Sequence, residues 1–145
     1  MGLGVSGVRK GYDGVVLAAP VTVPYTRFSI ESTAWWVGRA LAALSQASGI
    51  THKHFDGFSL ASFSTAPDTA IGLTQHFGLS PRFIDFIPMG GASGIVSIRH
   101  AARAVQAGDA DIVACVAADT NHVDSFRHSL ENFSRFSQDA VYPYG

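Results

Sequence analysis

The residues with the clearest chemical potential form a glycine-rich loop at positions 88–94, with the sequence PMGGASG. The loop separates a predicted strand (82–87) from a predicted amphipathic helix (94–108). At such a junction, unpaired backbone N–H groups and the positive end of the helix dipole face the same point. That arrangement suits a phosphate, a carboxylate or a developing oxyanion. The alternative interpretation is structural: the glycines only permit a tight turn and close packing.

Known nucleotide and nucleophile signatures do not fit this loop. It contains no G-x-G-x-x-G, and no lysine follows the glycines as in a P-loop. Ser93 nearly completes the nucleophile elbow G-x-S-x-G, although Ile95 takes the place of the last glycine. Candidate partners for a serine triad follow in the chain, namely Asp119, His122, Asp124 and His128. A serine hydrolase is therefore one alternative.

Other reactive side chains give weaker signals. His52 and His54 lie two residues apart beside Lys53, with no further ligands at metal-site spacing, so no metal site is predicted. Cys115 is the only cysteine, which excludes an internal disulfide and a cysteine-based zinc site. It lies in an apolar strand, where a thiol is usually an inert core residue.

Hydrophobic patterning predicts strands that alternate with helices. The predicted strands cover residues 15–19, 55–63, 82–87 and 111–118, and the last is apolar enough to be buried on both faces. The predicted helices cover 33–48, 67–78 and 94–108, and the last has an apolar stripe of Ile95, Ile98, Ala102 and Val105. Apolar spacing predicts a further helix from Val123 to Phe133. This alternation indicates an α/β fold around a parallel sheet.

Composition limits the partners of the chain. Charged residues make up 14% of the 145 residues, against about 25% in an average protein. The net charge is −1 and no basic patch forms, so neither nucleic acid nor an anionic membrane is an expected partner. No uninterrupted apolar run of 18 residues predicts a membrane span. The apolar excess indicates that further protein surface covers this chain.

Two stretches, residues 40–58 and 89–119, together resemble the N-terminal half of a thiolase. They resemble in particular the sterol-carrier-protein-type branch, and the similarity covers about half the chain. The resemblance implies a layered α/β fold whose parallel-rich sheet has helices on both faces, the first half of a duplicated fold. It divides the chain into a βαβ core (1–119) and the start of an inserted loop region (120–145).

The resemblance also assigns roles within the glycine-rich loop. The thiolase nucleophile stretch reads C-x-S-G, and here Gly91 stands in the place of the cysteine, so no catalytic residue is expected. The substrate or oxyanion loop would consist of Gly90, Gly91, Ala92, Ser93 and Gly94. The family's catalytic histidine and second cysteine come from its C-terminal half, which this resemblance does not cover. The chain as given is therefore expected to be catalytically incomplete.

The function implied by the resemblance is chemistry on acyl-CoA thioesters. It would be acyltransferase-type chemistry or retro-aldol cleavage of a carbon–carbon bond, as in relatives that lack the cysteine. The coenzyme A thioester would be substrate, with no bound cofactor or metal. The implied assembly is a homodimer or higher oligomer in the cytoplasm, with a small OB-fold protein as a further partner. The alternative is a non-catalytic thiolase-like subunit that pairs with an active one.

Overall fold

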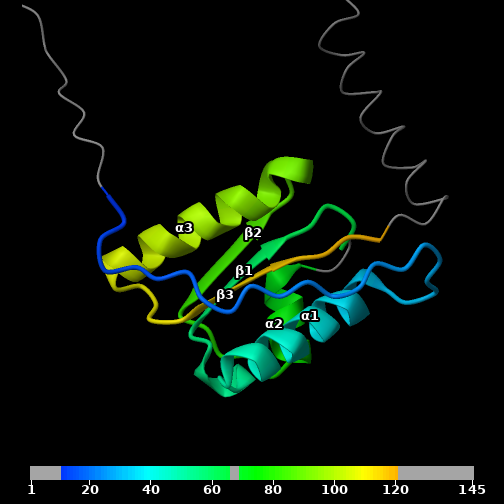
Figure 1. Ribbon diagram of the computed structural model, residues 1–145, viewed down its shortest axis with the longest axis horizontal. Coiled ribbons are helices and arrows are strands. Elements are labelled where there is room, and N and C mark those ends of the chain that lie inside the picture. Colours follow the sequence, from blue (N-terminus) through cyan, green and yellow to red (C-terminus); the bar gives the residue numbers. More distant parts are fainter. Residues whose placement is uncertain (1–10, 66–68, 121–145) are drawn as a thin grey trace, which may run out of the picture.

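The computed structural model describes residues 11–65 and 69–120 and has an α/β architecture. Three parallel strands form one sheet in the order β2-β1-β3 (Figure 1). They are β1 (Gly57–Ala61), β2 (Phe83–Ile87) and β3 (Val113–Ala117). Three of the predicted strands are confirmed within two residues at each end. The strand buried on both faces is β1 rather than β3, because β1 occupies the centre of the sheet.

The helices begin and end at residues with suitable capping chemistry. Helix α1 (Thr33–Ser48) starts where the Ser32 hydroxyl accepts a hydrogen bond from the Trp35 amide, and it stops at Gly49 with φ of 71°. Helix α3 (Ser93–Ala107) stops at Gly108, also in the left-handed region. Helix α2 (Ala70–His76) is shorter than predicted. Two 3-10 turns, η1 (His52–His54) and η2 (Gly90–Ala92), complete the elements.

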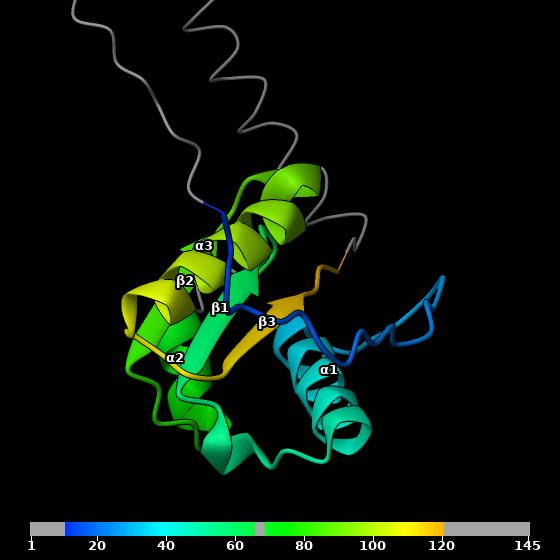
Figure 2. The ribbon, with the colours of Figure 1, turned by 60° about the vertical axis from the view of Figure 1, so that its left-hand side comes forward.

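The helices cover both faces of the sheet. The chain passes from β1 through α2 to its neighbour β2, and then returns through α3 past β1 to β3. Because βαβ crossovers are almost always right-handed, two crossovers in opposite directions place their helices on opposite faces. Figures 1 and 2 show this arrangement, with α1 and α2 on one face and α3 on the other.

The main hydrophobic core lies between the sheet and the α1–α2 layer. It contains the inward side chains of the strands and the buried faces of the two helices: Val37, Leu41, Phe55, Phe58, Leu60, Ala70, Leu73, Leu79, Ala114 and Val116. The α3 side is different, because α3 turns small residues toward the sheet, namely Ser93, Ser97, Ala101 and Ala104. The predicted apolar stripe of α3 is therefore wrong, and Ile95 is 74% exposed. Small side chains let the helix axis approach the strands closely.

The predicted strand at 15–19 does not form. Val16 and Leu17 are exposed, and this segment pairs with no strand in the described part of the chain. Pro20 has no N–H to donate to a ladder, and Ala19 has a positive φ of 50°. The residues just before this segment are held against α3, where Arg103 stacks over Tyr12 and donates a hydrogen bond to the Gly11 carbonyl.

Some predictions lie beyond the residues that the structure describes. They are the helix from Val123 to Phe133 and, apart from Thr120, the inserted loop region. Within the described ranges, no helix is long and apolar enough to cross a membrane.

Candidate functional site

The glycine-rich loop directly follows β2 and leads into α3, as the sequence predicts. Gly90 has φ of 64°, and residues 90–92 are exposed. A Cβ atom added at Gly91 or Gly94 would meet nothing within 4 Å, so packing does not require glycine at these two positions. Open space at Gly91 and Gly94 leaves the backbone accessible to a ligand. This observation favours the ligand-binding interpretation of the two glycines over close packing.

Electrostatics at the start of α3 favour an anion or an oxyanion. The first amides of any helix lack intrahelical partners and carry the positive end of its dipole. Ala92, at the N-cap position, has no side chain that could accept from them, and the first turn contains no acidic residue. The Ser93 amide already donates to the Gly90 carbonyl through the 3-10 turn. A negatively charged oxygen above Gly91 would therefore be stabilised by the positive end of the helix dipole, without displacing a side-chain cap.

Ser93 is placed as a structural residue rather than as a nucleophile. Its side chain is buried, and its hydroxyl accepts a hydrogen bond of 2.8 Å from the Met89 amide. This bond closes the loop upon itself and holds the turn that precedes α3. A hydroxyl turned back into its own loop does not face a substrate, which argues against the serine-hydrolase alternative.

The loop lies at the point where neighbouring connections diverge. β1 leads to α2 on one face of the sheet, whereas β2 leads to α3 on the other (Figure 2). In open α/β sheets, ligands bind in the crevice outside the carboxyl ends of the strands, and the glycine-rich loop lies at that edge. The segment after β1, from Ser62 to Thr65, lies at the same edge because β1 and β2 are parallel. Thr65 contributes a buried hydroxyl that lacks a hydrogen-bond partner among the described residues.

A hydroxyl-rich cluster fastens the carboxyl ends of β1 and β3. Asp119 Oδ1 accepts from the hydroxyls of Ser62 and Ser64 at 2.8 and 2.9 Å, and also from two backbone amides of that segment. The hydroxyls of Thr33 and Thr120 lie 2.8 Å apart, which joins the start of α1 to the end of β3. Within the described residues, Asp119 therefore ties the segments after β1 and β3 together. Asp124, His122 and His128 lie outside the described residues.

A buried polar row lies beneath α3 and was not recognised from sequence. Ser97 of α3 donates a hydrogen bond of 2.8 Å to Ser59 of β1, and both side chains are fully buried. Ser59 is in register with Asp85 on one side and Cys115 on the other. Burial raises the pKa of the Cys115 thiol, a hydrogen bond with Ser97 lowers it less, and Asp85 raises it further. The thiol is therefore protonated and unreactive at neutral pH.

A second polar pair lies at the edge of the same face. His100 Nδ1 and Asp85 Oδ2 are 2.8 Å apart, across the boundary between α3 and β2. They line an open groove of about 360 Å³ together with Phe83, Arg103, Ala104, Ala107 and Asp109. His100 and Asp85 are 15 positions apart in sequence and lie in different elements, so no local sequence motif predicts that they pair.

Two further histidines, His54 and His76, make contacts away from the glycine-rich loop. No group of three or more His, Cys, Asp or Glu side chains within the described ranges could hold a metal ion. His54 Nδ1 lies 2.8 Å from the Thr51 hydroxyl, and His76 packs edge-on against Phe77.

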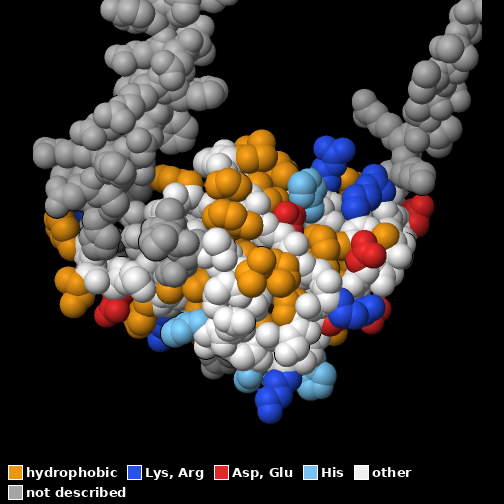
Figure 3. All heavy atoms as spheres, turned by 180° about the vertical axis from the view of Figure 1, so that it is seen from behind, with side chains coloured by type: hydrophobic (Ala, Val, Ile, Leu, Met, Phe, Trp, Pro, Cys, Tyr) orange, Lys and Arg blue, Asp and Glu red, His pale blue; other side chains and the backbone are white. Residues whose placement is uncertain are grey.

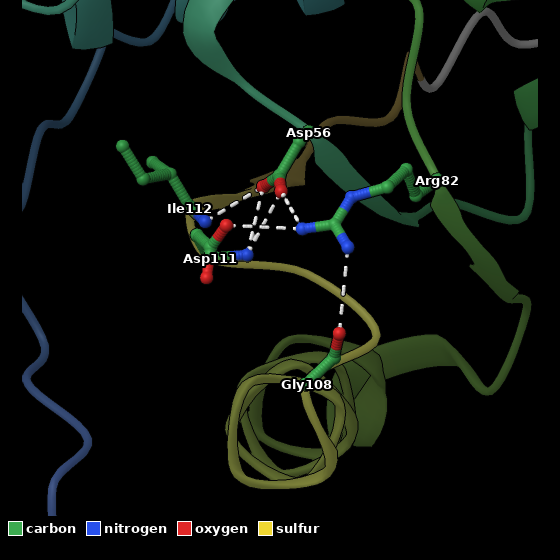
Figure 4. A network of polar contacts seen from close by, with 5 residues as sticks. All are labelled: Asp56, Arg82, Gly108, Asp111 and Ile112. Carbon is green, nitrogen blue, oxygen red and sulfur yellow. Dashed lines mark hydrogen bonds and ion pairs between the residues drawn. The ribbon is translucent and has the colours of Figure 1, made fainter.

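An ionic network at the opposite, amino edge of the sheet is structural (Figure 4). Asp56 accepts from the backbone amides of Asp111 and Ile112 and from the Arg82 guanidinium. Arg82 also contacts Asp111 at 3.0 Å and the Gly108 carbonyl at 3.4 Å. Desolvation alone would raise the pKa of Asp56, but the hydrogen bonds from Ile112, Arg82 and Asp111 outweigh it and lower the pKa overall. The network aligns the first residues of all three strands.

Comparison with known proteins adds no relative: no family model, no curated protein and no solved structure matches this chain.

Proposed function

We propose that this chain is a thiolase-like protein that acts on acyl-CoA thioesters, with the thioester carbonyl bound at residues 90–94. The observation that carries the proposal is the open loop before α3, where a Cβ added at Gly91 or Gly94 would meet no atom within 4 Å apart from chain neighbours and the helix's own backbone. The resemblance of residues 89–119 to the thiolase nucleophile region supports the choice of a thioester over other anionic ligands.

The proposed role of the loop is to stabilise charge on the thioester oxygen. In a retro-aldol cleavage, the bond between the α and β carbons breaks and its electron pair moves toward the thioester carbonyl, forming an enolate. The β-hydroxyl loses its proton to a base as it becomes a carbonyl, and the enolate then takes up a proton. Backbone N–H groups aimed at the enolate oxygen lower the barrier of such a step. Gly91 offers no side chain for acyl transfer, so the retro-aldol route suits this loop better.

Binding of acetyl-CoA to the chain tests the proposal. Gly91→Leu fills the open space and should weaken binding, measured by isothermal titration calorimetry, by about tenfold or more. Gly72→Leu is the matched control, because Gly72 is also exposed and lies in α2, on the face of the sheet opposite α3. Acetyl-CoA binding that Gly91→Leu leaves unchanged, or no binding at all, would refute the assignment of this loop.

A gain-of-function variant tests the geometry directly. Gly91→Cys places a thiol at the start of α3, where the helix dipole favours the thiolate. The resemblance predicts that acetyl-CoA then acetylates position 91, as detected by intact mass and peptide mapping, whereas the unsubstituted chain stays unmodified. An acetyl group on Ser93 or Cys115 in the unsubstituted chain would contradict the roles given to those residues.

The second candidate function is that of a non-catalytic partner subunit, and the edge of β2 favours it. Among the described residues, β2 pairs with β1 on one side only, and its Ile84 and Phe86 side chains are more than one-third exposed. An unpaired, apolar strand edge is a surface that proteins normally cover. We propose that a second copy covers it, in line with the homodimer that the resemblance implies. Phe86→Glu should then shift sedimentation from dimer to monomer. Dimerisation without acetyl-CoA binding would favour the subunit role.

A further inference from the structure

We propose that the start of α1 and the segment leading into it form a docking surface for another protein, one that presents carboxylates around an apolar side chain. We call it the aromatic–arginine surface. It consists of Trp35 and Arg39 on the first two turns of α1, and of Arg27, Phe28 and Ile30 in the segment that leads into α1. The proposal does not depend on the function proposed above, because none of these residues lies in the glycine-rich loop or on β2.

The apolar side chains of this surface are unusually accessible. Phe28 is 85% exposed, Ile30 is 96% exposed and Trp35 is 41% exposed. Trp35 is also held in place, because its ring packs edge-on against Trp36 with centroids 4.8 Å apart. A large ring that is already ordered loses little side-chain entropy on binding, and tryptophan is the residue most enriched among strong contributors to binding energy.

Two arginines flank the exposed rings. The Arg39 guanidinium lies 5.4 Å from the centroid of Trp35, and that of Arg27 lies 5.7 Å from the centroid of Phe28. Neither arginine forms an ion pair with a carboxylate in the described part of the chain. A guanidinium stacked on a ring keeps its N–H edge available, and that edge matches a carboxylate in a bidentate manner.

The charge of the aromatic–arginine surface indicates which kind of molecule binds to it. Between positions 25 and 39 the only acidic residue is Glu31, so the surface is net positive. A second copy joined by a two-fold axis would bring this positive surface against itself, which disfavours self-association here. Anionic membranes attract clusters of about four to eight basic residues, more than the two arginines present. Aromatic residues and arginine together are typical of the centre of a protein–protein interface.

The position of α1 keeps this surface apart from the β2 edge. α1 packs on the sheet beside β3, whereas β2 is the strand at the opposite edge (Figure 2). A dimer formed through β2 would therefore leave the aromatic–arginine surface free for a different chain.

Selection from a library of random twelve-residue peptides displayed on phage tests the proposal with the full chain as bait. Enriched peptides should combine Asp or Glu with an aromatic or aliphatic residue. Synthetic copies should bind, by fluorescence anisotropy, about tenfold or more weakly to Arg39→Glu and to Trp35→Ala. Arg99→Glu, which reverses an exposed arginine on α3, is the matched control and should bind normally. Circular dichroism establishes that each variant is folded.

Three kinds of result would overturn the proposal. The first concerns the peptides themselves: enriched sequences without acidic residues, or peptide binding that Arg39→Glu leaves unchanged. The second is a dimer in sedimentation analysis that Trp35→Ala dissociates, which would assign the surface to a second copy. The third is co-sedimentation with vesicles containing one-quarter phosphatidylserine that Arg27→Glu and Arg39→Glu abolish, which would assign it to a membrane.

Discussion

The two faces of the sheet are built from different chemistry. The face covered by α1 and α2 presents Phe58 and Leu60, which are completely buried among aliphatic and aromatic neighbours. The face covered by α3 presents Asp85, Ser59 and Cys115 side by side, beneath a helix that turns only small residues inward. Because side chains alternate along a strand, adjacent residues of β1 lie in two different environments.

This difference indicates that the two faces have different roles, one in stability and one in positioning α3. Burial of large apolar side chains supplies most of the stability of such a fold, and here it is concentrated on the α1–α2 face. The polar face instead positions α3, because the Ser97–Ser59 hydrogen bond fixes where this helix lies on the sheet. The glycine-rich loop leads directly into α3, so contacts beneath the helix help to position the amides proposed to bind a thioester. Figure 3 shows that the molecule also keeps apolar side chains on its surface, as expected if other protein chains cover it.

The largest expected effect is on the apolar face. Phe58→Ala should lower the free energy of unfolding by about 3–5 kcal/mol, because it removes a fully buried ring from the core. Urea denaturation followed by circular dichroism measures the loss. Phe86→Ala is the control, since Phe86 lies on the same face but is more than one-third exposed, so its loss should be much smaller. Equal losses would remove the basis for placing the main core on this face.

The second-largest loss of stability is expected at the amino edge of the sheet, which borders both faces. Asp56→Asn removes the charge that accepts from two amides and Arg82, at an expected loss of about 2 kcal/mol. The pKa of Asp56 is lower in the folded chain than its ordinary value of 3.8. Its stabilisation is therefore fully present above that value and is lost as the pH falls through the folded-state pKa. Denaturation curves across this acidic range should fall less steeply for Asp56→Asn than for the unsubstituted chain.

A smaller loss is expected from the polar face. Ser97→Ala leaves Ser59 without its buried partner and should destabilise the fold by about 1 kcal/mol. Because the two hydroxyls share one interaction, the double variant Ser59→Ala with Ser97→Ala should lose less than the sum of the single losses. Ser80→Ala, at an exposed loop position, provides the control. Additive losses would mean that the two hydroxyls do not act as a pair.

The smallest effect concerns reactivity rather than stability. Since burial raises the pKa of Cys115, its alkylation by iodoacetamide should be slow at neutral pH and reach half its maximal rate above pH 9.0. Ser97→Ala removes a hydrogen bond that favours the thiolate and should move this midpoint higher. A midpoint below 9.0 in the unsubstituted chain would contradict the protected environment assigned to this face.

Much of the local structure could be predicted from the sequence. Ser32 and Gly49 delimit α1, and Gly108 ends α3 where expected, because capping depends on residues within one turn. The prediction of a strand at 15–19 was wrong because a strand needs a neighbour, which local hydrophobicity cannot supply. The inward side of α3 was also predicted wrongly. Periodicity favoured Ile95 and Ile98, whereas close approach to the sheet selected smaller residues.

The sequence by itself determined the order of strands and helices and the position of the glycine-rich loop between β2 and α3. These features follow from secondary-structure propensity, helix capping and the conformational freedom of glycine, which depend on near neighbours in the chain. Only the tertiary structure decided that Asp85 meets His100, that Asp119 joins two loops, and that Ser93 turns inward. The two side-chain pairings join groups 15 to 57 residues apart and depend on which faces pack together. The inward turn of Ser93 depends on the path of the backbone between β2 and α3.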